Sequence, residues 1–346
     1  MTPGETQICA AQDLRELEAA WRELQEAGGI SHPMYSWEWM ATWWEVFGEQ
    51  RSLLALIKRK GGKVEAIAPF VRHRARMNRF FRFRRLELMG TGEQEADEVF
   101  SECVDLPLRP EGRTQAAREL ADQILDSNHE SKWDDVVLYR VRTDSAVCGA
   151  FGEGAANRGL SATRLTLGRC PYVELPGSVE DYERQLSGNR RQQIRRGVRA
   201  LERVGKLSFG KAQTVEEALV SLKMLAELHG QRWQAAGKPG AFAGRRFSEF
   251  HRRFIERTFA LGWPELWTLR VGQEPIACLY NIRYQRRVSF YQSGIKPLED
   301  NRVRPGMLAH YFASRDAIES GAVEYDFMLG ESRYKVSLSN ADRELV

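Results

Sequence analysis

Residues 266–294 read LWTLRVGQEPIACLYNIRYQRRVSFYQSG. Two runs rich in apolar and aromatic residues, Leu266–Val271 and Pro275–Tyr284, flank a short segment that contains the turn-forming residue Gly272. This pattern predicts a β-hairpin, because strand-forming runs separated by a few turn residues pair with each other. Arg286–Gly294 has a similar composition and predicts a third strand beside the hairpin.

The rest of the C-terminal half adds a helix, Met307–Glu319, and a strand, Val323–Met328, to these three strands. The first half repeats this order. A hairpin (Leu53–Lys58 and Val64–Arg72) is followed by a basic strand (Arg79–Leu88), by Pro110 and Gly112, by a helix (Arg113–Leu125) and by a strand (Asp134–Val141). This repetition predicts an α/β (α+β mixed) fold made of two similar lobes. We expect each lobe to hold a mixed, mostly antiparallel sheet flanked by helices, with lobes of residues 1–175 and 176–346.

Further helices are predicted on both sides of the repeated units, over Asp13–Glu26, Thr214–Trp233 and Phe247–Leu261. Thr214 followed by Glu217 has the spacing of a capping box at a helix start. Pro33–Phe47 contains four of the nine Trp residues: Trp37, Trp39, Trp43 and Trp44. This cluster fits either a helix packed into the core or an apolar wall at a substrate or membrane surface.

The composition excludes several classes of protein. The chain has 346 residues, enough for roughly two domains of about 150 residues each. With 42% apolar and 28% charged residues it is a globular protein and neither disordered nor fibrous. The five Cys residues form no CxxC pair and the six His residues form no HExxH motif, so we expect no metal site.

The N-terminus, residues 1–13, lacks the basic and apolar regions of a signal peptide. The longest apolar runs are far shorter than the 18 or so residues that span a bilayer. We therefore expect a cytoplasmic protein, with contact at the inner membrane surface as a further option.

The loop before residue 307 has the features of an anion site. Arg302 and Arg304 precede Pro305 and Gly306, which open the predicted helix. The first N–H groups of a helix have no partner within it and attract phosphate, and Arg holds phosphate through two parallel hydrogen bonds. Pro at a helix start and solvated loop arginines would also explain the pattern without any ligand.

This loop resembles the coenzyme A loop of the GNAT acyltransferases, although Arg302 or Arg304 with Gly306 and Ala309 only approximates the full motif of that family. The closer resemblance is to the two-lobed GNAT branch of cellulose- and envelope-polysaccharide-associated acyltransferases, which is related to the Fem-type aminoacyl transferases. Five segments carry it in order along the chain: Ser36–Gly48 (SWEWMATWWEVFG), Leu186–Leu207 (LSGNRRQQIRRGVRALERVGKL), His229–Trp233 (HGQRW), Tyr291–Gly294 (YQSG) and Asp326–Lys335 (DFMLGESRYK).

The resemblance implies two GNAT-like lobes and direct attack of an amine on an acyl-CoA thioester. Acyl-CoA is then a co-substrate, and no metal takes part. The resemblance does not give the acceptor. We expect an amine on an envelope precursor, either a long-chain amine (for example a sphingoid base) or an amino sugar, and the Trp cluster and the Arg–Phe stretch of residues 72–85 lean toward the lipid-like acceptor. We place the site in the C-terminal lobe, with cofactor contacts from Arg302, Arg304, Gly306 and Met307.

Amine attack on a thioester needs a group that takes the amine proton, a donor for the oxyanion and an acid for the thiolate. Tyr334 lies where many GNAT enzymes place the acid, and Lys335 is suited to neutralise an anion. His229 titrates near neutral pH and is suited to deprotonate the amine. Asp326 on its strand and Tyr291 at the end of the third strand complete the candidate catalytic set. Each of these residues also has an ordinary structural explanation.

Two basic stretches remain. Residues 72–85 hold seven arginines interleaved with three Phe, and residues 189–205 hold six arginines. Both could contact an anionic membrane surface, tRNA or an activated substrate, or could be solvated. Membrane contact is expected through Arg72–Arg85 and the Trp37–Trp44 cluster. A Fem-type ligase using aminoacyl-tRNA is less favoured because no sustained heptads indicate a coiled-coil arm, and a non-catalytic protein that binds a polysaccharide synthase is the third option.

Overall fold

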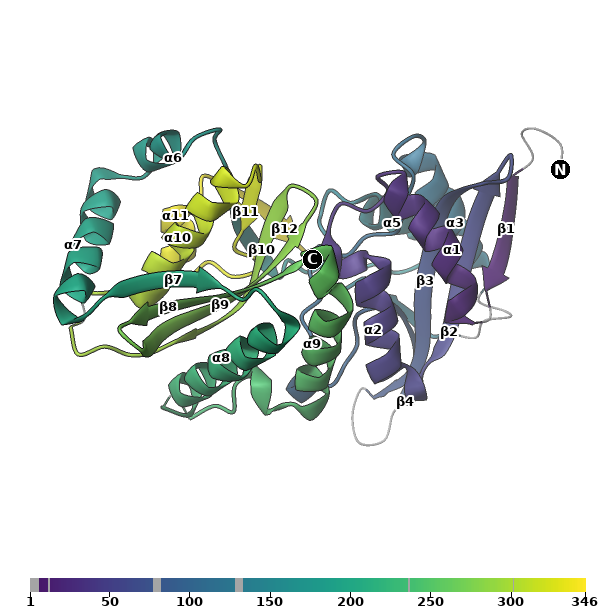
Figure 1. Cartoon of the computed structure of the whole chain (residues 1–346). Helices are drawn as coiled ribbons and strands as arrows, with labels where there is room; N and C mark the ends of the chain where they lie inside the picture. The colour runs from purple at the N-terminus through teal and green to yellow at the C-terminus, as the bar shows by residue number, and fades with distance from the viewer. Residues whose placement is uncertain (1–5, 12, 77–81, 128–132, 236, 301) are drawn as a thin grey trace. The chain divides into compact units, whose positions relative to one another are not determined.

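The computed structural model describes residues 6–11, 13–76, 82–127, 133–235, 237–300 and 302–346. The chain divides into two compact units, which are described separately (Figure 1). Unit 1 comprises Met1–Gly168 with Glu344–Val346, and unit 2 comprises Arg169–Arg343. The last residues of the chain belong to unit 1 because the backbone of Val346 forms two hydrogen bonds with Val141.

Unit 1 contains a five-stranded sheet with the strand order β1-β2-β3-β4-β5. Its strands are β1 (Thr6–Ala11), β2 (Ser52–Lys60), β3 (Lys63–Arg76), β4 (Arg82–Leu88) and β5 (Asp135–Val137). Its helices are α1 (Leu14–Glu26), α2 (Trp37–Phe47), α3 (Arg113–Asp126) and α5 (Ala146–Asn157). The predicted hairpin is confirmed as β2–β3, whose strands pair antiparallel, whereas β5 pairs parallel with β4. Arg79 and its two Phe neighbours lie outside the described residues.

The Trp cluster of α2 belongs to the core of unit 1. Trp39 and Trp43 are fully buried and Trp37 is 7% exposed, while Trp44 is half-buried. The indole N–H of Trp39 donates to Ser101 Oγ at 2.9 Å. The core alternative is therefore confirmed for Trp37, Trp39 and Trp43, whose rings pack against protein atoms, and membrane contact stays a prediction.

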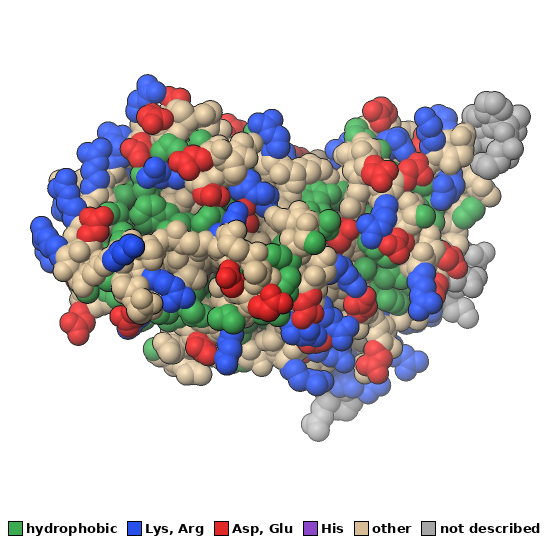
Figure 2. Space-filling model, in the orientation of Figure 1, with side chains coloured by type: hydrophobic (Ala, Val, Ile, Leu, Met, Phe, Trp, Pro, Cys, Tyr) green, Lys and Arg blue, Asp and Glu red, His purple; other side chains and the backbone are tan. Residues whose placement is uncertain are grey.

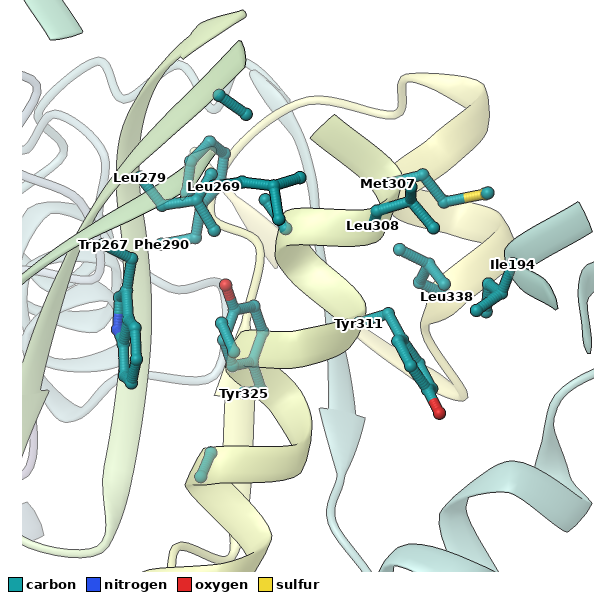
Figure 3. Close-up of a cluster of buried hydrophobic side chains, with 14 of the residues drawn as sticks. Ile194, Trp267, Leu269, Leu279, Phe290, Met307, Leu308, Tyr311, Tyr325 and Leu338 are labelled. Carbon is teal, nitrogen blue, oxygen red and sulfur yellow. The ribbon is translucent and has the colours of Figure 1, made fainter. Parts of the chain in front are cut away.

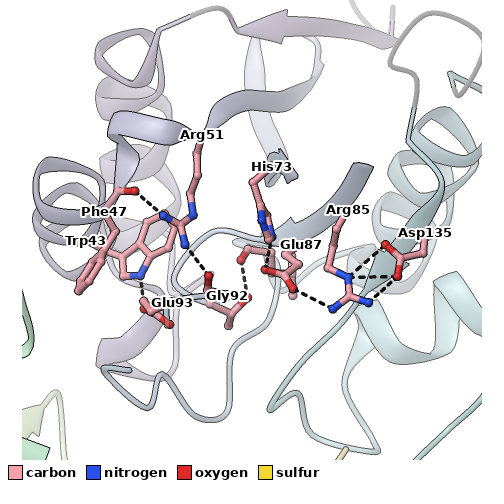
Figure 4. Close-up of polar contacts among 11 residues, drawn as sticks. Trp43, Phe47, Arg51, His73, Arg85, Glu87, Gly92, Glu93 and Asp135 are labelled. Atoms are coloured by element: carbon pink, nitrogen blue, oxygen red, sulfur yellow. Dashed lines mark hydrogen bonds and ion pairs between the residues drawn. The ribbon is translucent and has the colours of Figure 1, made fainter. Parts of the chain in front are cut away.

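A set of polar contacts joins α2 to the segment after β4 in unit 1 (Figure 4). Trp43 donates its indole N–H to the carboxylate of Glu93. The guanidinium of Arg51 lies 5.0 Å from the centre of the Trp43 ring. Burial raises the pKa of Glu93 to about 8, although the Trp43 hydrogen bond and the Arg51 charge oppose the shift. Farther along, Arg85 and Asp135 form an ion pair of 2.6 Å between β4 and β5.

Unit 2 is built on a seven-stranded sheet with the order β12-β6-β11-β10-β9-β8-β7. Its strands are β6 (Gly168–Glu174), β7 (Leu207–Lys211), β8 (Pro264–Val271), β9 (Glu274–Tyr284), β10 (Arg287–Ile295), β11 (Glu324–Asp326) and β12 (Ala341–Leu345). Its helices are α6 (Val179–Gln185), α7 (Gly188–Val204), α8 (Val215–Ala235), α9 (Arg245–Thr258), α10 (Pro305–Glu319) and α11 (Arg333–Leu338). Residues 169–174 were expected in the first lobe, but β6 pairs with β11 and lies in this sheet.

The three strands expected from residues 266–294 form as β8, β9 and β10, paired antiparallel in sequence order. The pairing of β10 with β9 contains a β-bulge between Phe290 and Gln292. On its other side β10 pairs parallel with β11 only from Arg287 to Ser289. The pairing stops where β11 ends at Asp326, although β10 continues to Ile295.

Helices cover both faces of this sheet (Figure 1). Gly294 of β10 lies against α8, where a Cβ atom on Gly294 would come within 2.4 Å of the Leu225 carbonyl oxygen. On the opposite face the buried side of α10 contributes Met307 and Leu308 to a core that also holds Phe290 and Tyr325 (Figure 3). Helix α10 therefore packs beside the part of β10 that does not pair with β11.

The predicted start of α8 is confirmed in a slightly altered form. The backbone N–H of Glu217 donates to Thr214 Oγ1 at 3.2 Å, and the Glu217 carboxylate accepts from the N–H of Gln213 at 2.7 Å. The carboxylate thus reaches one residue farther back than in the usual capping box. Among the described helices of both units, none combines the length and apolar character needed to cross a bilayer.

Candidate active site

A pocket of about 350 Å³ lies in unit 2 at the N-terminus of α10. It is lined by residues from α8, β10, α10 and α11, with the loop before α10: Arg232, Ser293, Ile295, Arg304, Pro305, Gly306, Met307, His310, Arg333 and Tyr334. The pocket opens beside β10 in the part of that strand that no longer pairs with β11. The pocket therefore lies where β10 and β11 are no longer paired.

The first turn of α10 presents free backbone donors to this pocket. Pro305 is the first helical residue and has no N–H, so Gly306 and Met307 supply the first amide donors. The N-cap residue, Arg304, makes no side-chain hydrogen bond to the helix. These amide groups and the positive end of the helix dipole favour a bound anion.

Three arginines add positive charge to the same pocket: Arg232, Arg304 and Arg333. None of the lining residues in the described chain is acidic, and none of the three arginines is within ion-pair distance of a described carboxylate. Arg190 of α7 approaches from outside the lining, with Nη1 2.8 Å from Met307 Sδ. Burial and then the nearby charge of Arg304 lower the pKa of Arg190. A bound anion would relieve this repulsion between like charges.

Of the residues predicted to bind cofactor, Arg304, Gly306 and Met307 line the pocket. Arg302 does not line it. Its side chain is 88% exposed and forms an ion pair with Asp300 at 2.8 Å. The two loop arginines therefore have different surroundings, because Asp300 neutralises the first and no described carboxylate neutralises the second.

Tyr334 is the one predicted catalytic residue that lines the pocket. Its ring stacks on His310 with centroids 5.3 Å apart and an interplanar angle of 18°. Burial raises the pKa of Tyr334 to about 12, so the phenol stays protonated at neutral pH. A protonated phenol can donate a hydrogen bond or a proton to an anionic leaving group.

His229 is held by backbone groups on both sides of its ring. Nδ1 lies 3.1 Å from the Ser293 carbonyl oxygen, and Nε2 accepts from the Ala241 N–H at 3.4 Å. Because Nε2 accepts, Nδ1 donates to Ser293, a residue that lines the pocket. Burial, despite the Ser293 hydrogen bond, lowers the pKa of His229. The geometry fits a residue that fixes the end of β10.

Alternation predicted that one of Tyr291 and Gln292 faces the site, and Tyr291 was favoured because the resemblance includes it. Instead its hydroxyl lies 2.8 Å from His251 Nε2, and its ring lies 4.5 Å from the ring of that α9 residue. The preceding residue, Phe290, contacts His310 of α10 with ring centroids 4.5 Å apart. Phe290 and Tyr291 thus face opposite sides of the sheet, as alternation along a strand requires, and Tyr291 does not line the pocket.

Asp326 and Lys335 make contacts within the fold and do not line the pocket. Asp326 is 1% exposed, accepts from the Met328 N–H at 2.7 Å and forms an ion pair with Arg343 at 3.3 Å. Burial raises its pKa to about 6. Lys335 Nζ donates to the carbonyl oxygen of Leu329 at 2.7 Å. The two side chains hold the turn that follows β11.

Four polar or charged lining side chains were not singled out from the sequence: Arg232, Ser293, His310 and Arg333. Arg333 lies within the quoted segment 326–335, and Arg232 lies one residue before Trp233 in the quoted segment 229–233. The two quoted segments could therefore have indicated Arg232 and Arg333 as candidate site residues. His310 gives no signal of its own, because it lies inside an apolar helix and is 1% exposed.

The two basic stretches differ in structure. On β4, Arg84 pairs with Asp134 at 2.7 Å, and Arg85 pairs with Asp135, so acidic partners neutralise part of the first stretch. The second stretch forms α7, and Figure 2 shows Lys and Arg side chains along the edge where α7 lies. Four α7 arginines are exposed and have no described carboxylate partner: Arg195, Arg196, Arg199 and Arg203.

Comparison with known proteins agrees with this architecture. Residues 188–336, which contain the pocket, match the sequence profile of the Acetyltransferase (GNAT) domain. No curated protein sequence matches the chain.

Three solved structures are similar in fold over nearly the whole chain. The structure of FemX has a TM-score of 0.60 at 10% identity and covers 98% of this chain and 96% of its own. A tandem GNAT protein from the clavulanic acid biosynthesis pathway has a TM-score of 0.51 at 12% identity, with coverages of 99% and 97%. The C-terminal domain of a putative lysylphosphatidylglycerol synthetase from Agrobacterium fabrum has a TM-score of 0.51 at 10% identity, with coverages of 96% and 91%.

The predicted resemblance and fold class are confirmed. Residues 188–336 match the GNAT domain profile, and the chain has a mixed α/β architecture similar in fold to the structures of FemX and of the tandem GNAT protein. The identities with these structures lie below 25%, so the likeness to them concerns the fold alone.

Proposed function

We propose that this two-lobed relative of the GNAT acetyltransferases is an N-acyltransferase that moves an acyl group from coenzyme A to an amine, with unit 2 binding the donor. The observation that carries the proposal is the pocket at the start of α10. There, the free amides of Gly306 and Met307 meet three arginines, and no described lining residue is acidic. Coenzyme A carries a pyrophosphate, and this donor set matches two adjacent phosphates.

The residues also fit the remainder of the donor. From Phe290 to Ile295, β10 has no described pairing with β11, so its edge on that side can accept an extended chain such as the pantetheine arm. Tyr334 and His310 lie on the wall of the same pocket. The acyl end of the donor would reach the point at which the two strands separate.

The reaction requires no covalent intermediate on the protein. The amine lone pair forms a bond to the thioester carbonyl carbon, the C–S bond breaks, and the ammonium proton passes to water. Tyr334, protonated at neutral pH, gives its proton to the departing thiolate and regains one from solvent. His229 is a positioning residue that holds Ser293 at the end of β10.

For the acceptor we propose an amine on an envelope precursor, either a long-chain amine such as a sphingoid base or an amino sugar. The fold-level likeness to a protein named as a putative lysylphosphatidylglycerol synthetase supports testing lipid-linked amines first.

Calorimetric titration of the full chain with CoA, acetyl-CoA and palmitoyl-CoA at two salt concentrations tests the donor. We expect all three to bind, because they share the pyrophosphate. Tighter binding of palmitoyl-CoA would indicate a long-chain donor. Failure of all three to bind a folded sample would contradict the proposal.

One observation favours a second candidate, a Fem-type ligase that uses aminoacyl-tRNA. The exposed arginines of α7 belong to the helix whose Arg190 contacts Met307 at the pocket. Phosphate contacts along a nucleic acid make affinity fall steeply with salt. Salt-sensitive binding of charged tRNA without binding of CoA would select this candidate. A protein that binds neither would fit the third option, a non-catalytic partner of a polysaccharide synthase.

A further inference from the structure

His310 occupies the point at which the central strands of unit 2 separate. The last paired residues of β10 and β11 are Ser289 and Asp326. Phe290 follows on β10 and Phe327 directly follows the end of β11, and both rings contact His310, with centroid distances of 4.5 Å for Phe290 and 5.3 Å for Phe327. His310 is 1% exposed and nevertheless lines the pocket.

One nitrogen of the His310 ring is already engaged within the protein. Nδ1 lies 3.0 Å from the hydroxyl of Tyr325, which lies 3.5 Å from Asn281 Oδ1 on its other side. A hydroxyl hydrogen bond to oxygen is normally 2.5–3.0 Å long, so about 3.5 Å is too long for a strong bond. The hydroxyl can donate to Asn281 Oδ1 or to Nδ1, and Nδ1 at 3.0 Å is the nearer of the two acceptors.

The surroundings keep both partners in the protonation states that this bond needs. Burial raises the pKa of Tyr325 far above its ordinary value, so the phenol retains its proton. Burial, followed by the positive charge of Lys335, lowers the pKa of His310 to about 3. The imidazole is thus neutral at physiological pH. With Nδ1 accepting, the single ring proton is on Nε2.

We propose that His310 is a neutral hydrogen-bond donor whose Nε2–H contacts the carbonyl oxygen of the bound acyl donor, and that Tyr325 is a positioning residue that selects this tautomer. The inference rests on the proposed function, because it needs a carbonyl donor in this pocket. As the amine adds, the carbonyl oxygen gains negative charge and the Nε2–H bond strengthens without transferring its proton. The electron pair returns when the C–S bond breaks, so His310 is unchanged at the end of the step.

The tautomer can be measured directly on the full-length protein. In a sample labelled with ¹⁵N-histidine, the His310 signals are assigned by their loss in His310→Gln. We expect a protonated Nε2 and an unprotonated Nδ1 over pH 6–8. A ring protonated on Nδ1, or charged in this range, would overturn the inference.

Ligands then separate the carbonyl contact from donor binding. Acetonyl-CoA keeps a carbonyl but cannot be cleaved, and CoA has no carbonyl at that position. We expect acetonyl-CoA to shift the His310 Nε2 resonance and CoA to leave it nearly unchanged, while both bind. Equal shifts with both ligands would contradict the His310 role and leave the proposed function standing. Absence of binding by either ligand would defeat the proposed function and this role with it.

Variants give a kinetic readout with acetyl-CoA as donor and hydroxylamine as nucleophile, followed by thiol release. Removing one oxyanion donor costs about 10²–10³ in rate, so we expect His310→Leu to lose about 100-fold in kcat while CoA affinity changes less than about twofold. His310→Gln keeps an N–H donor and should recover part of the rate. Tyr325→Phe, which lets the ring proton redistribute between the nitrogens, should give an intermediate loss. His310→Leu with an unchanged kcat would refute the role.

Discussion

Replacing Arg304 with Ala is the sharpest test of the anion site. Arg304 lines the pocket as the N-cap residue of α10 and has no described carboxylate partner. A hydrogen bond to a charged group contributes about 1.5–3 kcal/mol. Arg304 is exposed, so solvent and salt screen it and the lower part of that range applies. We therefore expect a loss of about 1.5–2 kcal/mol, or roughly 10- to 30-fold weaker CoA binding.

The same substitution should leave the fold intact. Arg304 lowers the pKa of Arg190 by its charge, so its removal relieves a repulsion and should leave the thermal midpoint unchanged or slightly raised. Arg302→Ala is the matched control, because Arg302 is paired with Asp300 and lies outside the pocket lining. Calorimetric titration with CoA and thermal unfolding of both variants give the comparison. A CoA affinity of Arg304→Ala within twofold of wild type, or an equal loss in Arg302→Ala, would refute the placement of the phosphates.

Three further predictions concern stability and pocket shape. The folded pKa of Glu93 is about 8, above its ordinary value of 4.5, so its stabilising contribution is complete below pH 4.5 and is lost as the pH rises through 8. In Glu93→Gln the unfolding free energy, measured by urea denaturation, should fall less steeply between pH 5 and 8 than in the wild type. An unchanged dependence of the unfolding free energy on pH would assign the effect to other groups. Gly294→Ala should destabilise the protein by several kcal/mol (about 2–4), because the added Cβ meets the Leu225 carbonyl oxygen at 2.4 Å, and a wild-type melting temperature would contradict that packing. Gly306→Ala should fold normally, since its Cβ meets only the tip of Ile295 at 3.1 Å, yet weaken CoA binding severalfold by narrowing the pocket; unchanged titration would argue against close approach of the phosphates.

The local elements of the fold could be predicted from the sequence because their causes are local. Alternating apolar residues and Gly272 predicted the hairpin β8–β9, and Pro305 with Gly306 predicted the start of α10. Arg304 was identified for the same reason, since a loop residue at a helix start lies near the free amides wherever the helix packs. The strand expected over Asp134–Val141 shortened to Asp135–Val137, because pairing with β4 covers only those residues.

Alternation along β10 predicted that one of Tyr291 and Gln292 faces the site, and the resemblance favoured Tyr291. In the structure Phe290 contacts His310 of α10, whereas Tyr291 contacts His251 of α9. Which face of a strand borders a pocket depends on the helices packed against the sheet, and the sequence of the strand alone does not reveal it. Likewise, the neutralisation of Arg302 by the half-buried Asp300 became evident only from their ion pair.

By itself the sequence determined the order of elements in the two units, the helix start at Pro305 and Gly306 with arginines before it, and the resemblance to GNAT transferases, because each depends on residues close together in the chain. Only the tertiary structure decided which side chains meet at the pocket. Arg232, His310 and Arg333 come from three helices far apart in sequence. Their convergence depends on how α8, α10 and α11 pack around the separating strands, and that packing is set by the burial of apolar surface from the whole of unit 2.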